Sequence, residues 1–334
     1  TRSDGGAIYA SSLISVVFGN STISNSFAFG HGGGIAVASS SDFLVHRSLF
    51  ESNTANYGGA GIYVTYAERF MVSAVSLITN TALYFGGGLM VDKLSEDVKI
   101  SNITAEGNTA NWGGAIYVGV RHTNVDILNG LFYDNRAFTG GGGAVVIDTA
   151  NTGVVVDYCM FDGNIAVNGG ALHFNTENPS VHVNNSVFSN NTAREAGGSV
   201  LFNADNTNAM VAENEFLDSI ATNGGALAFL SSNTGANIMN NRIDGNEAES
   251  GGGLYFHLLN TGYTITDDVF TNNNANDCGA IQSYSSSGEV RDTSFRNNSA
   301  VIAGGAACFE SVNNIVVNNA TFYGNTQTGA TVDA

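Results

Sequence analysis

The stretch GNTANWGGAIYV, residues 107–118, contains a phrase that returns along the whole chain: an Asn, a small residue, a Gly-Gly pair and an apolar run. Related stretches are ESNTANYGGAGIYV from residue 51, DGNIAVNGGALHF from 162 and DGNEAESGGGLYF from 244. A catalytic motif normally occurs once in a chain. A phrase repeated along all 334 residues therefore describes a structural unit.

The repeated phrase has a nearly constant spacing. The first small residue of each Gly-Gly-like pair stands at positions 5, 32, 58, 86, 113, 142, 169, 197, 224, 251, 278, 304 and 328, so the period is about 27 residues. A second phrase, Phe-x-x-Asn, keeps the same period, for example from Phe132 to Asn135 and from Phe161 to Asn164. Internal repeats of this length indicate a solenoid or an array.

The pattern inside each repeat predicts the fold. Short apolar segments with a period of two alternate with polar turns, and no helix-length amphipathic run occurs. We therefore predict an all-β fold, a right-handed parallel β-helix of about twelve coils, in which each coil buries the apolar face of the next. Residues 1–334 are expected to form one domain. Since both ends lie inside the repeat, we expect this domain to be a portion of a longer protein.

The Asn of the second phrase is expected to form a ladder at one corner of the coil. Stacked amide side chains can bond to each other between coils, which favours the same residue at every level. The Phe residues should stack inside the coil for the same reason, and the Gly pair permits a sharp bend. The predicted ladder comprises Asn25, Asn53, Asn80, Asn108, Asn135, Asn164, Asn191, Asn246, Asn273, Asn298 and Asn325.

Charge and cysteine content restrict the classes of function. The formal net charge is −18, and the only lysines are Lys93 and Lys99. Such a surface repels phosphate backbones and anionic membranes, so we expect no nucleic-acid binding and no membrane insertion by this segment. The cysteines, Cys159, Cys278 and Cys308, are odd in number and fit no metal spacing. We expect them to be small buried apolar residues.

Carboxylates are the residues that a polysaccharide-cleaving β-helix would need. They cluster here in or near predicted turns, and the repeat length hardly varies, so no insertion is large enough to build a cleft. We predict no catalytic residue, no metal site and no cofactor. A polysaccharide lyase or hydrolase with a shallow site on one sheet face is the alternative. The acidic clusters are Glu213/Glu215/Asp218, Asp244/Glu247/Glu249 and Asp267/Asp268.

Six Asn-x-Ser/Thr sequons are candidate N-glycosylation sites, in a number that this composition would give by chance. They begin at Asn20, Asn102, Asn184, Asn190, Asn297 and Asn319.

The strand after each Gly-Gly pair has an unusual outward column. If the first Gly is counted as phase zero, phases three and five hold large apolar residues and should point inward, so phase four should point outward. Outward positions of a half-exposed sheet are normally polar, whereas phase four carries almost no charge. Phase four reads Tyr9, Ala36, Met90, Tyr117, Val146, His173, Leu201, Ala228, Tyr255, Gln282 and Cys308, with Tyr63 added if Gly61 is a one-residue bulge.

Two interpretations of this column stay open. A second subunit, a neighbouring domain or a glycan could cover it, or its tyrosines could be isolated exposed residues of the kind that strands commonly carry. The candidate interface residues are Tyr9, Tyr63, Met90, Tyr117, His173 and Tyr255.

The paired phrases also resemble those of a known family. Gly113-Gly114-Ala115-Ile116 with Phe132-x-x-Asn135, and Gly5-Gly6-Ala7-Ile8, closely resemble the repeats of the chlamydial polymorphic membrane proteins, and the resemblance covers essentially the whole chain. It implies a surface-exposed β-helical passenger domain of an autotransporter that acts in adhesion. We therefore expect an extracellular or cell-surface, non-enzymatic adhesion or structural rod. A subunit of a surface filament is a third class of function compatible with such repeats.

Overall fold

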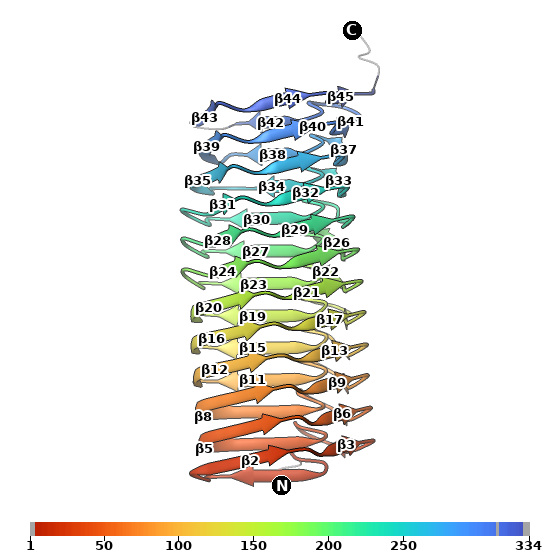
Figure 1. The fold of residues 1–334 in the computed structure, drawn as a ribbon, viewed down its shortest axis with the longest axis vertical. Coiled ribbons are helices and arrows are strands. Elements are labelled where there is room, and N and C mark those ends of the chain that lie inside the picture. Colours follow the sequence, from red (N-terminus) through yellow and green to blue (C-terminus); the bar gives the residue numbers. More distant parts are fainter. Residues whose placement is uncertain (1–3, 312–313, 330–334) are drawn as a thin grey trace.

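The computed structural model, which describes residues 4–311 and 314–329, is a rod of stacked coils (Figure 1). None of these residues lies in a helix, and the strands pair in parallel with their equivalents in the neighbouring coils. The all-β parallel β-helix of about twelve coils is thus confirmed. Each coil contributes strands to four ladders that run along the rod.

The first ladder begins after the Gly-Gly corner. Its strands are β1 (Ile8–Ser11), the first part of β5 (Ile35–His46), the first part of β8 (Ile62–Ser73), β11 (Leu89–Lys93), β15 (Ile116–Val120), β19 (Val145–Thr149), β23 (Leu172–Thr176), β27 (Val200–Ala204), β30 (Leu227–Ser231), β34 (Leu254–Phe256), β38 (Ile281–Tyr284) and β42 (Ala307–Glu310).

The second ladder continues the same sheet, because β5 and β8 run through both ladders without a break. Its further strands are β2 (Ser15–Gly19), β12 (Glu96–Ser101), β16 (Thr123–Leu128), β20 (Thr152–Asp157), β24 (His182–Asn184), β28 (Met210–Ala212), β31 (Asn237–Met239), β35 (Thr261–Thr266), β39 (Ser287–Arg291) and β43 (Ile315–Asn318).

The third ladder is a sheet of twelve short strands. They are β3 (Thr22–Ser24), β6 (Leu49–Glu51), β9 (Ser76–Ile78), β13 (Thr104–Glu106), β17 (Leu131–Tyr133), β21 (Met160–Asp162), β25 (Val187–Ser189), β29 (Glu215–Leu217), β32 (Arg242–Asp244), β36 (Val269–Thr271), β40 (Ser294–Arg296) and β44 (Thr321–Tyr323).

The fourth ladder falls into a sheet of seven strands and a sheet of four, joined by isolated bridges at Ile220 and Asn223. Its strands are β4 (Phe27–Ala28), β7 (Thr54–Ala55), β10 (Thr81–Ala82), β14 (Thr109–Ala110), β18 (Arg136–Ala137), β22 (Ile165–Asn168), β26 (Thr192–Ala196), β33 (Glu247–Ser250), β37 (Asn274–Asp277), β41 (Ser299–Ala300) and β45 (Thr326–Gln327).

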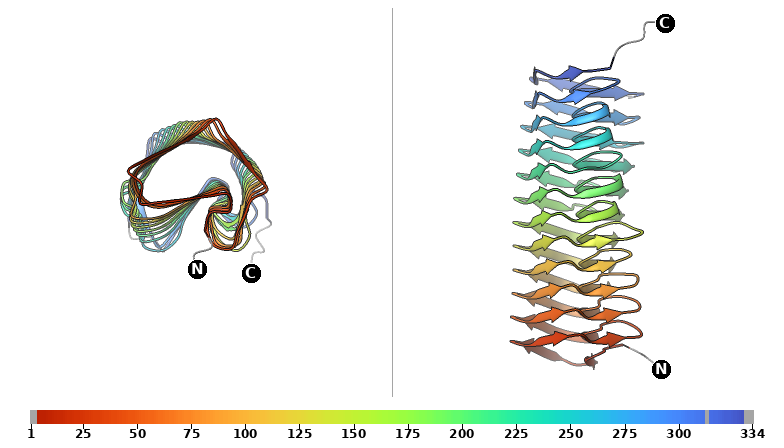
Figure 2. Two further views of the ribbon diagram at one scale, coloured as in Figure 1. Left: turned by 90° about the horizontal axis from the view of Figure 1, so that it is seen from below. Right: turned by 90° about the vertical axis from the view of Figure 1, so that its right-hand side faces the viewer.

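Between the fourth ladder and the next Gly-Gly corner, each coil folds back on itself. We call this piece the hook, and in four coils it includes the last residues of β22, β26, β33 and β37. In successive coils it comprises residues 56–58, 83–85, 111–112, 138–141, 167–168, 194–196, 222–223, 249–250 and 276–277. Seen along the rod axis, the hooks superpose into a narrow lobe beside the wide lobe that holds the core (Figure 2). The corner Gly makes this path possible: Gly113 has φ 61°, and a Cβ there would lie 2.3 Å from the Ile116 carbonyl oxygen.

One corner differs from its predicted position. Gly59 has the left-handed φ of the third coil, and Ile62 pairs with both Ile35 and Leu89. The extra residue therefore precedes the corner, and the strand after it is regular. A bulge at Gly61 was the wrong explanation for how Tyr63 reaches phase four.

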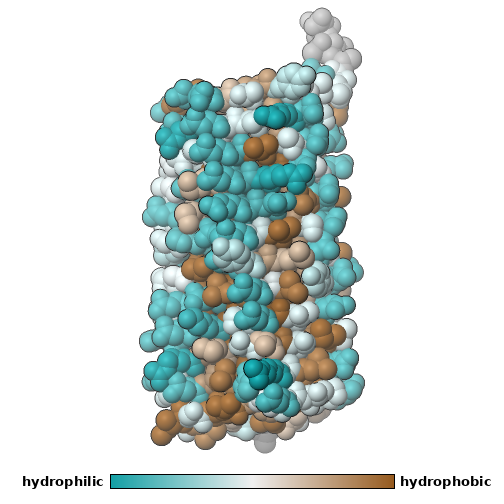
Figure 3. Space-filling view, viewed as in Figure 1, coloured by the Kyte–Doolittle hydropathy of each residue, from teal (hydrophilic) through white to brown (hydrophobic). Residues whose placement is uncertain are grey.

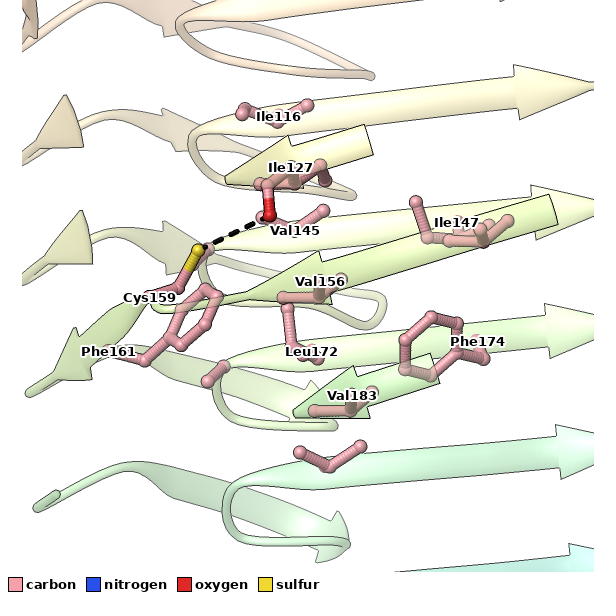
Figure 4. Packing of buried hydrophobic residues seen from close by; sticks show 14 of the residues in the cluster. Ile116, Ile127, Val145, Ile147, Val156, Cys159, Phe161, Leu172, Phe174 and Val183 are labelled. Carbon is pink, nitrogen blue, oxygen red and sulfur yellow. Dashed lines mark hydrogen bonds between the residues drawn. The ribbon is translucent and has the colours of Figure 1, made fainter. Parts of the chain in front are cut away.

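The core consists of columns of identical or similar side chains. Phe132, Phe161 and Phe188 are fully buried, and their rings stack at centroid separations of 4.6 and 4.8 Å. Figure 4 shows Phe161 and Phe174 among other buried side chains of the core. A second column runs from Phe174 to Phe256 with separations of 4.6–5.0 Å. These centroid separations match the spacing of hydrogen-bonded strands. In-register stacking therefore gives each ring inside a column a partner above and below.

Candidate functional site

The predicted apolar column is covered by the chain's own hook. Tyr63, Met90, Tyr117 and Val146 form a buried cluster with Ala36, and Phe85 and Trp112 of the hook pack against it. Tyr63, Met90, Tyr117 and His173 are only 3–8% exposed, so the interpretation of these four residues as an intermolecular interface is wrong. The physical reason is that the strand is covered on both faces, inside by the core and outside by the hook. Of the predicted set, Tyr9 is 42% exposed and Tyr255 is half-buried.

Hook and column fit each other closely. A Cβ on Gly58 would lie 2.4 Å from Met90 Sδ, and one on Gly141 would lie 1.7 Å from His173 Nδ1. His173 also contacts Trp112, with a ring-centroid separation of 5.7 Å. Neither ring nitrogen of His173 has a hydrogen-bond partner. Burial lowers the pKa of His173 to about 4, so the ring is neutral at neutral pH.

Two tyrosines of the column donate hydrogen bonds to aspartates on the first ladder of strands. The Tyr63 hydroxyl donates to Asp92 Oδ2 at 3.0 Å, and the Tyr117 hydroxyl donates to Asp148 Oδ2 at 2.5 Å. Burial, followed by the charge of the carboxylate, raises the pKa of both tyrosines. Both phenols therefore stay protonated and act as hydrogen-bond donors beside the hook.

In the N-terminal coils a groove opens between the hook and the first ladder. His31 stacks on Tyr63 and Tyr57 with centroid separations of 4.3 and 5.4 Å, and Asp92 also lines the groove. The Tyr84 ring lies next to Tyr57, with 5.7 Å between the ring centroids, and the two tyrosines, which we call the rim, are 42% and 51% exposed. Flat aromatic faces beside carboxylates suit a ligand with apolar faces and hydrogen-bond donors at its edges.

A second groove lies on the outside of the second ladder. Arg69 donates to both oxygens of Asp42, at 2.5 and 2.8 Å, and Lys99 Nζ lies 3.9 Å from Asp126 Oδ2. Hydrogen bonding to Arg69 lowers the pKa of Asp42, whereas burial raises the pKa of Asp126. On the face drawn in Figure 3, hydrophilic residues dominate and apolar ones are more frequent toward the N-terminal end. Val17 in β2 is 64% exposed.

Comparison with known families agrees with the architecture. The family model described as "Right handed beta helix region" matches residues 6–188, which is more than half of the chain. The chain belongs to this family. A search of curated proteins found no match to the chain.

Within this right-handed β-helix, ten of the eleven predicted ladder asparagines lie in file. In a typical rung, Asn108 donates from its backbone N and its Nδ2 to Asn135 Oδ1, at 3.0 Å each, and from Nδ2 to the Leu77 carbonyl. Asn25 is the exception: it is exposed with φ 53°, and Ser26 takes the rung position below Asn53. The prediction missed this because both residues follow Ile23 closely and only Asn25 is an asparagine. The other ten are Asn53, Asn80, Asn108, Asn135, Asn164, Asn191, Asn246, Asn273, Asn298 and Asn325.

Two further inner ladders of the β-helix were not predicted. One lies between the first and second ladders of strands and contains Ser95, His122, Asn151, Asn178, Asn206, Asn233, Asn260 and Ser286. The other lies between the second and third ladders and contains Cys159, Ser186, Asn214, Asn241 and Asp268. Both mix residue types, so no single repeated letter marks them. The faint signal is a polar or small residue just before each apolar strand.

Cys159 agrees with the prediction, whereas Cys278 and Cys308 differ from it. Cys278 and Cys308 form a disulfide that joins two successive coils, and Cys159 is a buried free thiol. Burial raises the pKa of the Cys159 thiol to about 12. Sequence reasoning missed the pair because Cys278 replaces a corner Gly and Cys308 stands at phase four, so the two meet only when coils stack.

The sequons lie at two corners. Asn20, Asn102 and Asn319 precede the third ladder, Asn190 and Asn297 follow it, and all five are exposed with a left-handed φ. Asn184 instead lies within β24 and is half-buried. Of the acidic clusters, Glu215 and Asp244 both pair with Arg242 at the surface, whereas Asp268 is completely buried. Among residues 4–311 and 314–329, no three His, Cys, Asp or Glu side chains are placed to share a metal ion, and no helix could cross a membrane.

Proposed function

We propose that this β-helix is an extracellular, non-enzymatic binding rod that acts in adhesion or as a structural module. The observation that carries the proposal is the N-terminal groove, where exposed aromatic rings stand in file on a rigid support. Loops and insertions are not needed to build it, because each coil adds one hook to the row. Tyr57 and Tyr84 present their rings to solvent while the hook itself is held by the buried cluster beneath.

Several features support this proposal. The Gly-Gly-Ala-Ile and Phe-x-x-Asn phrases are similar to the repeats of adhesive chlamydial polymorphic membrane proteins. The Cys278–Cys308 disulfide suits an oxidising compartment, where such bonds persist. A glycan or another protein subunit fits the groove best, since the net charge of −18 disfavours anionic partners.

The experiment compares the adhesion of the wild-type rod with that of a variant that lacks both exposed tyrosines of the rim. Fluorescent beads carrying the wild-type rod, or the Tyr57→Ala/Tyr84→Ala variant, are scored for retention on cultured cells and on a panel of immobilised neutral and anionic polysaccharides. We expect at least a tenfold loss of retention, because exposed aromatic anchors dominate such interfaces. Tyr158→Ala is the matched control, since Tyr158 is 64% exposed at a corner far from the groove. Equal retention of all three proteins would contradict the proposal.

A polysaccharide lyase or hydrolase is the second candidate, and the outer groove on the second ladder favours it. Arg69, Lys99 and Asp126 are the residue types that such chemistry uses. Incubation with uronic-acid-containing and neutral polysaccharides, followed by assays for unsaturated products and new reducing ends, separates the two candidates. We expect no turnover. Turnover that Asp126→Asn abolishes would establish the enzyme instead.

A further inference from the structure

Asp268 is a carboxyl group at a position where neighbouring coils carry an amide. It belongs to the inner ladder between the second and third ladders of strands, one coil after Asn241 and two after Asn214. The residue is completely buried. Its Oδ1 accepts from the Asn241 backbone N at 2.7 Å and from Asn241 Nδ2 at 2.9 Å, as an amide oxygen would.

The second carboxyl oxygen of Asp268, Oδ2, takes the place of the amide nitrogen of the neighbouring rungs and cannot make its hydrogen bond when the carboxyl group is ionised. In Asn214 and Asn241, the side-chain nitrogen also donates to a carbonyl of the preceding coil, that of Val183 and Val211 respectively. The equivalent acceptor for Asp268 is the carbonyl of Ile238, which pairs in register with Val211. Asp268 Oδ2 is buried and has no hydrogen-bond partner. An ionised carboxylate would place two acceptors against each other here, whereas a protonated one supplies the missing donor.

The groups around Asp268 offer no compensating positive charge. On its own corner, Asp267 is acidic and raises the pKa of Asp268 further. On the preceding coil, Arg242 is exposed and already paired with Glu215 and Asp244. On the following coil, Arg291 is exposed and donates to the hydroxyl of Thr266. The inner side of the rung faces the apolar core, which contains Ile238, Ile243, Ile265, Phe270, Val290 and Phe295.

We propose that Asp268 stands in the folded rod as a neutral acid whose Oδ2–H donates to the Ile238 carbonyl, so that this coil is held while Asp268 keeps its proton and is loosened when the proton is lost. Asp268 thus stabilises the C-terminal half of the rod in a pH-dependent way. Burial, the largest cause, raises its pKa to about 7.

The direction of the pH effect follows from linkage. The folded pKa lies above the ordinary value of 3.8, so the folded state binds the proton more tightly than the unfolded chain. The stability from this proton is complete below about pH 4 and is lost as pH rises through about 7. The folded-to-unfolded ratio should fall about a thousand-fold over that range because of this one group.

The experiment measures thermal unfolding midpoints at pH 5 and pH 8 for the wild type, Asp268→Asn and Asp267→Asn. An amide at position 268 supplies the donor at every pH. We therefore expect Asp268→Asn to raise the midpoint at pH 8 by several degrees and to change it little at pH 5, so that the midpoint at pH 8 minus that at pH 5 becomes more positive than in the wild type. Asp267→Asn, at the exposed neighbour, should keep most of the wild-type difference. If Asp268→Asn leaves the difference unchanged or lowers the midpoint at pH 8, the proposal is wrong.

A direct titration covers the case in which the variant fails to fold. The side-chain carboxyl of Asp268 in the wild-type rod is followed by carbon-13 NMR between pH 4 and 8. A midpoint near 7 supports the neutral rung. A carboxyl already ionised at pH 5 would overturn it.

Discussion

The N-terminal and C-terminal stretches of the hook carry different surfaces. Between residues 27 and 138, the fourth ladder and hook expose Phe29, Tyr57, Leu83, Tyr84 and Phe138, each at 42–68%. Between residues 194 and 276 most of the corresponding exposed residues are charged or amide side chains, such as Arg194, Glu247, Glu249, Asn274 and Asn276, and Ile220, 47% exposed, is an apolar exception. The residues that repeat therefore build the rod, whereas those that do not repeat give each stretch its own surface.

The buried layer beneath the hook differs in the same way. Under the N-terminal stretch lie the large side chains Tyr63, Met90 and Tyr117. Under the C-terminal stretch lie Leu201 and Ala228, which cluster with Ala196 of the hook. Aromatic packing thus holds the hook against the first ladder in the N-terminal stretch, whereas close backbone approach holds it there in the C-terminal stretch. A substitution that has the same effect in both halves tests the repeated scaffold. A substitution whose effect differs between the halves tests the surface of one half.

The largest effect should come from the Asn ladder and should be the same in both halves. Asn108→Ala and Asn246→Ala each remove bonds to the next rung and to a core carbonyl and leave buried groups unpaired. We expect a loss of about 3 kcal/mol in the free energy of unfolding for each, measured by chemical denaturation. The control, Asn185→Ala, changes a partly exposed corner residue. A loss in only one half would show that the ladder does not hold the rod uniformly.

Two buried titratable groups, His173 and Asp268, should make the stability of the rod respond to pH in opposite directions. His173 has a folded pKa of about 4, below its ordinary 6.5, so the unfolded chain binds its proton more tightly. Stability from neutral His173 is complete above pH 6.5 and is lost as pH falls toward 4, by about 3 kcal/mol, whereas Asp268 loses stability as pH rises. His173→Leu should flatten the acid limb of a plot of unfolding midpoint against pH. An unchanged acid limb would place the sensitive group elsewhere.

Gly141 tests the close fit of hook and column in the N-terminal half. The Gly141→Ala change places a methyl group against His173, which is fully enclosed, so we expect a loss of about 1–3 kcal/mol. The double variant Gly141→Ala/His173→Ala should recover part of that loss, because the smaller residue makes room. Denaturant midpoints provide the measurement. Additive losses in the double variant would mean that the two residues do not touch.

The smallest effects on stability should come from the exposed residues that distinguish the two surfaces. Tyr57→Ala and Arg194→Ala should each change the free energy of unfolding by less than about 0.5 kcal/mol, since neither side chain is part of the buried layer. If Tyr57→Ala unfolds the hook, shown by faster proteolysis at residues 56–58, the rim has a structural role and the binding test must be repeated with Tyr84→Ala alone.

The sequence was sufficient to predict the features that repeat in every coil. The 27-residue period, the Phe columns and the Asn rungs follow from the requirement that like side chains meet between coils. The sequence was insufficient for what depends on the path of the chain between ladders. Alternation places Tyr117 on the outside of its strand, and only the folded hook reveals that Trp112 lies beside it. The Cys278–Cys308 bond and the Asp268 rung were missed for the same reason, since each depends on the register of particular coils.

The most direct test of stacked, in-register coils is a distance between two spin labels on one corner. Cysteines replace Asn102 and Asn319, which are exposed and occupy equivalent corners eight coils apart. Double electron–electron resonance should give a single narrow distance of about 38 Å, from a rise of roughly 4.8 Å per coil. A broad distribution, or a peak far below that distance, would contradict the stacking on which the ladders, the hook and the groove all depend.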